Sequence, residues 1–68
     1  MRISARNVLK GKIVDVKKGA TTAHVRIDLG GSVITASITN EAVDELGLKE
    51  GMTASAVIKA SDVMVAVD

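Results

Sequence analysis

Apolar and polar residues alternate through most of this chain, which is the period-two pattern of half-buried β-strands. The clearest example is the segment 23–29, in which polar residues separate alanine, valine, isoleucine and leucine. The same alternation predicts strands over 32–39 and 52–60. It also predicts a last strand over 63–67, where every second residue is valine.

Two further extended segments, 3–9 and 12–17, precede these strands and are joined or bent at Gly11. Later in the chain, Gly30 and Gly31 supply the backbone freedom that a tight hairpin turn needs. The predicted strands are therefore separated by short turns and by no long linker.

One short helix is predicted between Thr39 and Gly47. Thr39 or Asn40 can cap its first turn, and Gly47 stands where a helix end favours a left-handed residue. Val43 and Leu46 are three residues apart and share one face of this helix.

We therefore expect an all-β chain with one short helix, which lies between the third and fourth of about five strands. A small β-sheet avoids exposed edges by curling into a barrel. The expected architecture is a small OB-like five-stranded barrel, a single domain over residues 1–68.

The composition predicts that this domain self-associates. A chain of 68 residues buries only about 60% of its unfolded surface, and this one has no Phe, Tyr or Trp to enlarge the core. It has no cysteine and one histidine, so disulfides and thiolate zinc sites are absent. Oligomerisation is the remaining way to support so small a core.

Charge and hydropathy exclude two classes of partner. The net charge is +1 and aromatic residues are absent, whereas proteins that bind single-stranded nucleic acid use a basic groove and aromatic platforms. No stretch approaches the roughly 20 apolar residues that span a bilayer, and the first residues do not resemble a signal peptide. We expect no nucleic-acid partner, no membrane partner and a cytoplasmic location.

Catalysis is not expected either. His24 lies on the polar face of a predicted strand, and nothing around it resembles a nucleophile turn. The pair Gly30 and Gly31 belongs to a hairpin and lacks the helix and lysine of a phosphate loop.

What the chain does offer is hydrogen-bond donors without nearby carboxylates. A deprotonated tetrahedral oxyanion consists only of acceptors, so such donors suit it. The candidate oxyanion-binding residues are Ser4, Arg6 and Asn7 near the start, Thr39 before the helix, and Lys59, Ala60 and Ser61 near the end.

Each of these residues also has a purely structural interpretation. Ser4 and Arg6 fit the solvated face of an edge strand, and Asn7 fits a buried amide that satisfies a backbone group. Lys59 fits a charge that protects a strand edge, and Thr39 fits a helix cap. The residues alone indicate a candidate anion binder and nothing more specific.

Three strings of the sequence narrow this interpretation. They are ISARN followed by LKGK within 3–12, AVDELGLKEG over 42–51, and AVIKASDVMVAV over 56–67. In this order and over essentially the whole chain they resemble the molbindins, small molybdate- and tungstate-binding proteins that also occur as transport-associated OB domains. SARN and VIKAS with DVM are the most specific of these motifs.

The resemblance implies a non-enzymatic protein that binds molybdate or tungstate for intracellular molybdenum storage, buffering or homeostasis. It implies OB-type barrels that exchange or share strands in dimers, which assemble as a homohexamer, a trimer of dimers. The oxyanion is bound at subunit interfaces, and no side chain ligates the metal directly. The site residues carried over are Ser4, Arg6 and Asn7 of one subunit, with Thr39, Lys59, Ala60 and Ser61 of a neighbour.

One departure and one alternative stay open. Several molbindins carry serine where this chain has Ala42, so a hydroxyl donor near the helix start is missing. The alternative is a regulatory or protein-interaction module, in which the oxyanion is a signal or incidental. The sequence does not distinguish molybdate from tungstate, because the two anions have nearly the same size and charge.

Overall fold

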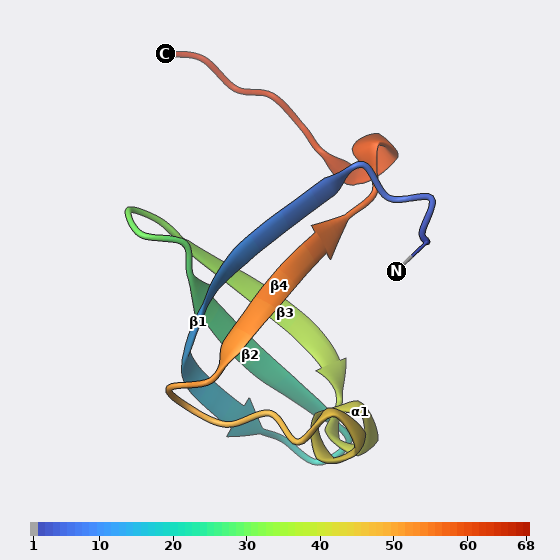
Figure 1. Cartoon of the computed structure of the whole chain (residues 1–68), viewed down its shortest axis with the longest axis vertical. Helices are drawn as coiled ribbons and strands as arrows, with labels where there is room; N and C mark the ends of the chain where they lie inside the picture. Colours follow the sequence, from blue (N-terminus) through green and yellow to red (C-terminus); the bar gives the residue numbers. More distant parts are fainter. Residues whose placement is uncertain (1) are drawn as a thin grey trace.

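Four antiparallel strands curl into a half-barrel in the computed structural model, which describes residues 2–68 (Figure 1). The strands lie in the order β3-β2-β1-β4. One helix, α1, follows β3, and one 3₁₀ turn, η1, follows β4. The elements are β1 (Asn7–Lys18), β2 (Thr22–Asp28), β3 (Val33–Thr39), α1 (Asn40–Leu46), β4 (Thr53–Ile58) and η1 (Ala60–Asp62).

The first strand is longer and more continuous than the sequence predicts. Instead of two segments bent at Gly11, β1 is one strand that pairs with β4 along its first half and with β2 along its second. Its irregularity falls between Ile13 and Asp15, where the register shifts by one residue. The extra residue increases the local twist, which curves the sheet.

Gly11 has a different role, which is to allow close approach of two backbones. A Cβ atom at this position would lie 2.4 Å from the carbonyl oxygen of Asp28 and 2.8 Å from a methyl carbon of Ile27. No real side chain fits in that space. The glycine therefore lets β1 cross close to the end of β2.

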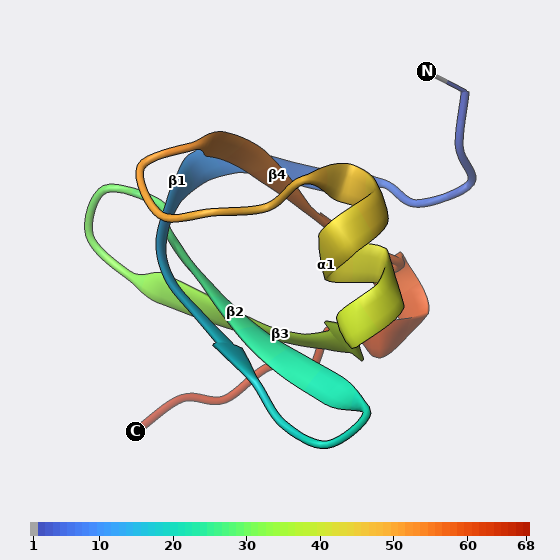
Figure 2. The ribbon, with the colours of Figure 1, turned by 90° about the horizontal axis from the view of Figure 1, so that it is seen from below.

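The core lies on the concave side of the half-barrel, as the alternation predicts. Ile13 and Val25 are the largest fully buried side chains, and Val43 of α1 packs against them. Figure 2 shows α1 lying across one end of the curved sheet. The buried residues are Ala5, Ile13, Ala23, Val25, Ile27, Val43 and Ala56, all of them small or medium-sized.

The helix has the caps that the sequence predicts. The hydroxyl oxygen of Thr39 accepts a hydrogen bond of 3.0 Å from the backbone N–H of Ala42. Gly47 adopts the left-handed conformation with φ of 62°, and the N–H of Leu48 donates to the carbonyl of Val43 at 3.0 Å. These contacts satisfy backbone groups that a helix end leaves unpaired.

The single chain forms four of the five predicted strands, and they curl into a half-barrel that does not close. Residues 63–68 form no strand and extend away from the sheet (Figure 1). The exposed fraction is 50% for Val63, 89% for Val65 and 92% for Val67. The valines alternate as they do in a strand. A strand forms only where a neighbouring strand supplies backbone hydrogen-bond partners, and within residues 2–68 no strand lies beside this segment.

Replacing Gly11 with alanine is expected to lower the free energy of unfolding by about 1–3 kcal/mol, because the added methyl group collides with a backbone that cannot move freely. Chemical denaturation followed by circular dichroism measures the change. Gly31→Ala is the matched control, since nothing lies within 4 Å of its added Cβ atom. Equal stability of the two variants would contradict the close approach at Gly11.

Candidate functional site

The β1–β4 ladder ends where the two most specific sequence motifs meet. Its last pair is Asn7 with Ile58, and the side-chain amide of Asn7 donates to the Ile58 carbonyl at 3.2 Å. Extending this antiparallel register by one place sets Arg6 opposite Lys59. Residues 2–6, which precede β1, and η1, which follows β4, therefore leave the sheet from this same end of the ladder (Figure 1).

The structural role predicted for Asn7 is confirmed, because its half-buried amide satisfies a backbone carbonyl. The arrangement of the two segments differs from the one that the resemblance implies. SARN and KAS were expected to face each other from different subunits, whereas a single chain already brings them to the same end of the sheet. Six of the seven candidate residues lie in these two segments.

The donor side chains at this end of the sheet have no partners among the residues that the structure describes. Ser4, Arg6, Lys59 and Ser61 are exposed, and within residues 2–68 none of their side chains makes a hydrogen bond or ion pair. The backbone of η1 is held in place: the N–H of Asp62 donates to the Lys59 carbonyl at 2.9 Å. The N–H of Ala60 donates to no acceptor in that part of the chain.

Thr39 lies elsewhere. It pairs with Thr22 at the end of β3, and the next residue, Asn40, donates its backbone N–H to the Thr21 carbonyl at 2.9 Å. These contacts place the helix start beside the turn that follows Lys18. Asn7 and Lys18 are opposite ends of the twelve-residue strand β1, so Thr39 of the same chain is remote from Arg6 and Lys59.

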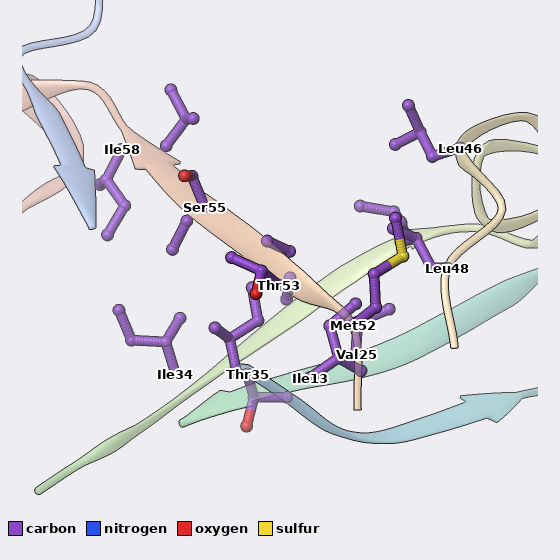
Figure 3. Close-up of a pocket in the computed structure, with 16 residues that line it drawn as sticks. Ile13, Val25, Ile34, Thr35, Leu46, Leu48, Met52, Thr53, Ser55 and Ile58 are labelled. Carbon is purple, nitrogen blue, oxygen red and sulfur yellow. The ribbon is translucent and has the colours of Figure 1, made fainter. Parts of the chain in front are cut away.

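A second feature, which the sequence did not predict, is an apolar groove of about 630 Å³ on the concave side. It runs between β3 and β4, the two strands whose outer edges are unpaired in the sheet of this chain. Figure 3 shows Ile34 of β3, Ile58 of β4 and Met52 among its lining residues.

The donor cluster suits binding better than catalysis. It combines a guanidinium, an ammonium, two hydroxyls and a backbone N–H, and it contains no histidine to act as a general base. Across residues 2–68, no group of three or more His, Cys, Asp or Glu side chains is placed to hold a metal ion. In the same residues, no helix is long and apolar enough to cross a membrane.

Comparisons with known proteins agree with this picture. The family model of the TOBE domain matches residues 3–65. Molybdenum-pterin-binding protein 1 of Clostridium pasteurianum is 54% identical over 66 residues, which are 96% of this chain and 97% of that protein.

Solved structures show the same similarity. A molybdate-binding protein from Sporomusa ovata has a TM-score of 0.94 and 33% identity, with 98% of this chain and 100% of that chain covered. The cytoplasmic molybdate-binding protein ModG, with molybdate bound, has a TM-score of 0.89 and 52% identity, covering 94% of this chain and 46% of ModG. These relatives are binding proteins, which confirms the prediction of a non-enzymatic domain.

Replacing Thr39 with alanine is expected to lower the free energy of unfolding by about 1 kcal/mol, because the Ala42 N–H loses its acceptor. Thr39→Ser keeps the hydroxyl oxygen and is expected to retain most of the stability. Thermal and chemical denaturation measure both variants. If alanine and serine variants were equally stable, the capping role of Thr39 would be refuted.

Proposed function

Because the chain belongs to the TOBE-domain family and is half identical to small molybdenum-pterin-binding proteins, we propose that it binds molybdate as an intact oxyanion in the cytoplasm. The binding of tungstate is part of the proposal, since the two dianions present the same four acceptor oxygens. The protein then stores or buffers molybdenum and performs no chemistry on it.

The observation that carries this proposal is the pair of unneutralised cations at the end of the β1–β4 ladder. Arg6 and Lys59 stand opposite each other in the extended register and form no ion pair within residues 2–68. Two like charges on adjacent strands repel each other unless an anion lies between them. A tetrahedral dianion removes this repulsion and gains charge-assisted hydrogen bonds.

The hydroxyl and backbone donors favour molybdate over phosphate. Ser4 and Ser61 flank the two cations, and the N–H of Ala60 adds a neutral donor. Hydrogen phosphate carries a proton that needs an acceptor, and a site built of donors leaves that proton unpaired. Sulfate lacks such a proton, so discrimination against sulfate rests on size.

We place this site at an interface between subunits. The cations of one chain line one side of the bound anion, and Thr39, remote within the same chain, reaches it only from a neighbouring copy. The Thr39 hydroxyl accepts from Ala42, and its own hydrogen is still available to donate. The missing hydroxyl at Ala42 leaves one donor fewer on the neighbour's side than in several molbindins.

The apolar groove and the 63–67 segment support assembly. The groove lies between two free strand edges, and the segment carries valines at every second position but projects away from the sheet. Inserted into the groove of a second copy, it adds the fifth strand and closes the barrel. Burying each valine contributes about 1.5 kcal/mol or more, which offsets the marginal core. The homohexamer, a trimer of dimers, follows from the resemblance to the molbindins.

Arg6→Ala and Lys59→Ala are each expected to weaken molybdate binding by about tenfold or more, because each removes a charge-assisted hydrogen bond. Isothermal titration with molybdate, tungstate and sulfate measures the effect. Lys49→Ala is the matched control, since Lys49 is an exposed lysine in the turn before β4. If the Arg6 variant binds molybdate as tightly as the parent, the site assignment is wrong.

Deleting residues 63–68 is expected to leave a monomer, whereas the full chain is expected to be an oligomer by native mass spectrometry. A sharper pair of variants is Val65→Asp and Met64→Asp, because alternate residues of a strand face opposite sides. The Val65 variant places a charge in the apolar groove and should dissociate, and the Met64 variant should not. An unchanged oligomer after deletion would exclude the strand exchange.

A further inference from the structure

A single residue outside the proposed anion site joins the β1–β2 turn to the start of α1. Asn40 is the first residue of α1 and directly follows Thr39. Its side-chain amide donates to the carbonyl of Gly19 at 2.9 Å, and its backbone N–H donates to the carbonyl of Thr21 at 2.9 Å. Figure 1 shows α1 beside this turn. Two hydrogen bonds from one residue therefore fix the helix start to the turn.

The turn that Asn40 contacts is itself closed by a hydrogen bond. The N–H of Gly19 donates to the carbonyl of Thr22 at 2.7 Å, so both backbone polar groups of Gly19 are engaged. Thr22 also pairs with Thr39 across β2 and β3. The backbone of Thr39 is thus held from two sides, by its strand pair with Thr22 and by Asn40, its neighbour in the chain.

A second contact between the turn and the helix contributes less to this placement. Lys18 and Asp44 form an ion pair at 2.5 Å between Nζ and Oδ1, but their side chains are 45% and 67% exposed. An ion pair so exposed contributes little, because water and salt screen it and two mobile side chains lose freedom. The amide of Asn40 is uncharged and its side chain is short, so its hydrogen bond has neither disadvantage.

The other atom of the same amide indicates a role beyond stability. Oδ1 of Asn40 is buried and accepts no hydrogen bond within residues 2–68. A buried acceptor without a partner lowers the stability of the fold. Turning the amide over would set this oxygen against the carbonyl of Gly19, which is also an acceptor. Asn40 therefore makes its contact at a cost in stability, which is typical of residues that serve a functional site.

The hydroxyl of Thr39 is directed by a separate contact. Its oxygen accepts a hydrogen bond of 3.0 Å from the N–H of Ala42. The hydroxyl hydrogen consequently points away from that N–H and is left for an acceptor outside the helix. Thr39 is exposed, so such an acceptor can reach it. The place of this donor is set by Asn40 and Thr22, and its direction is set by Ala42.

We propose that Asn40 is a positioning residue for the bound oxyanion and acts through Thr39. The inference rests on the proposed function, in which Thr39 of one copy donates to an anion held by a neighbouring copy. Asn40 does not bind the anion itself, because its Nδ2 is engaged with Gly19 and its Oδ1 would repel a negative charge. An anion held by the cations of one copy cannot follow a displaced hydroxyl on another, so affinity depends on where Thr39 is held.

A double-mutant cycle on the full-length protein tests whether Asn40 acts through Thr39. Thr39→Ala is expected to weaken molybdate binding by about tenfold or more, because a charge-assisted hydrogen bond is lost. Asn40→Ala is expected to weaken binding by about fivefold, because the hydroxyl remains but is no longer held in place. In the double variant the Asn40 change should add less than about twofold. Isothermal titration measures the parent and the three variants.

Ile27→Val is the matched control for a loss of stability, because it removes one buried methyl group and leaves residues 39–42 unchanged. This variant should bind molybdate as tightly as the parent. Amide hydrogen exchange without molybdate gives a second measurement. In Asn40→Ala the N–H of Ala42 should exchange about fivefold faster, in excess of any change at the amides of β2. In Ile27→Val the amides of Ala42 and of β2 should change alike.

The possible outcomes separate this inference from the proposed function. If the parent binds molybdate and Asn40→Ala binds it as tightly, the inference is overturned and the proposed function stands. Additive losses in the double variant would have the same consequence, because Asn40 would then act independently of Thr39. Unchanged exchange at Ala42 would also overturn the positioning role. A parent that binds no molybdate would overturn the proposed function and this inference together.

Discussion

The structure depends on the two-sided pairing of β1, which joins β4 to the β2–β3 hairpin. Ile13 is the centre of this arrangement: its side chain is 1% exposed, its N–H donates to Met52, and its carbonyl accepts from Gly51. The bulge next to it and the close approach at Gly11 allow one strand to serve both halves of the sheet. Without aromatic residues, the core has no other large contact that could replace this one.

The local structure was largely predictable from the sequence because it depends on near neighbours. The strands 23–29 and 32–39 and the helix caps at Thr39 and Gly47 follow from alternation and from residue conformational preference, and the structure confirms them within one residue. The continuity of β1 was not predictable, because the presence of glycine does not tell whether it bends a strand or permits the close approach of another backbone. The 63–67 alternation predicted a strand that the single chain does not form, because alternation does not specify which backbone supplies the hydrogen-bond partners.

The sequence named the candidate site residues but did not predict how they are placed relative to one another in the fold. The motifs SARN and VIKAS name the candidate donors, and only the β1–β4 register shows that the two motifs lie at the same end of one sheet, where its last pair is Asn7 with Ile58.

The pairing of Asn7 with Ile58 joins residues 51 positions apart. Closing so long a loop costs conformational entropy that local contacts do not repay, so the contact persists only when the intervening hairpin and helix are already folded. The two cations of the donor cluster are therefore brought together only in a completely folded chain. Unfolded or fragmentary chains hold the same residues without this pairing, so a ligand of the proposed site binds the folded chain and stabilises it.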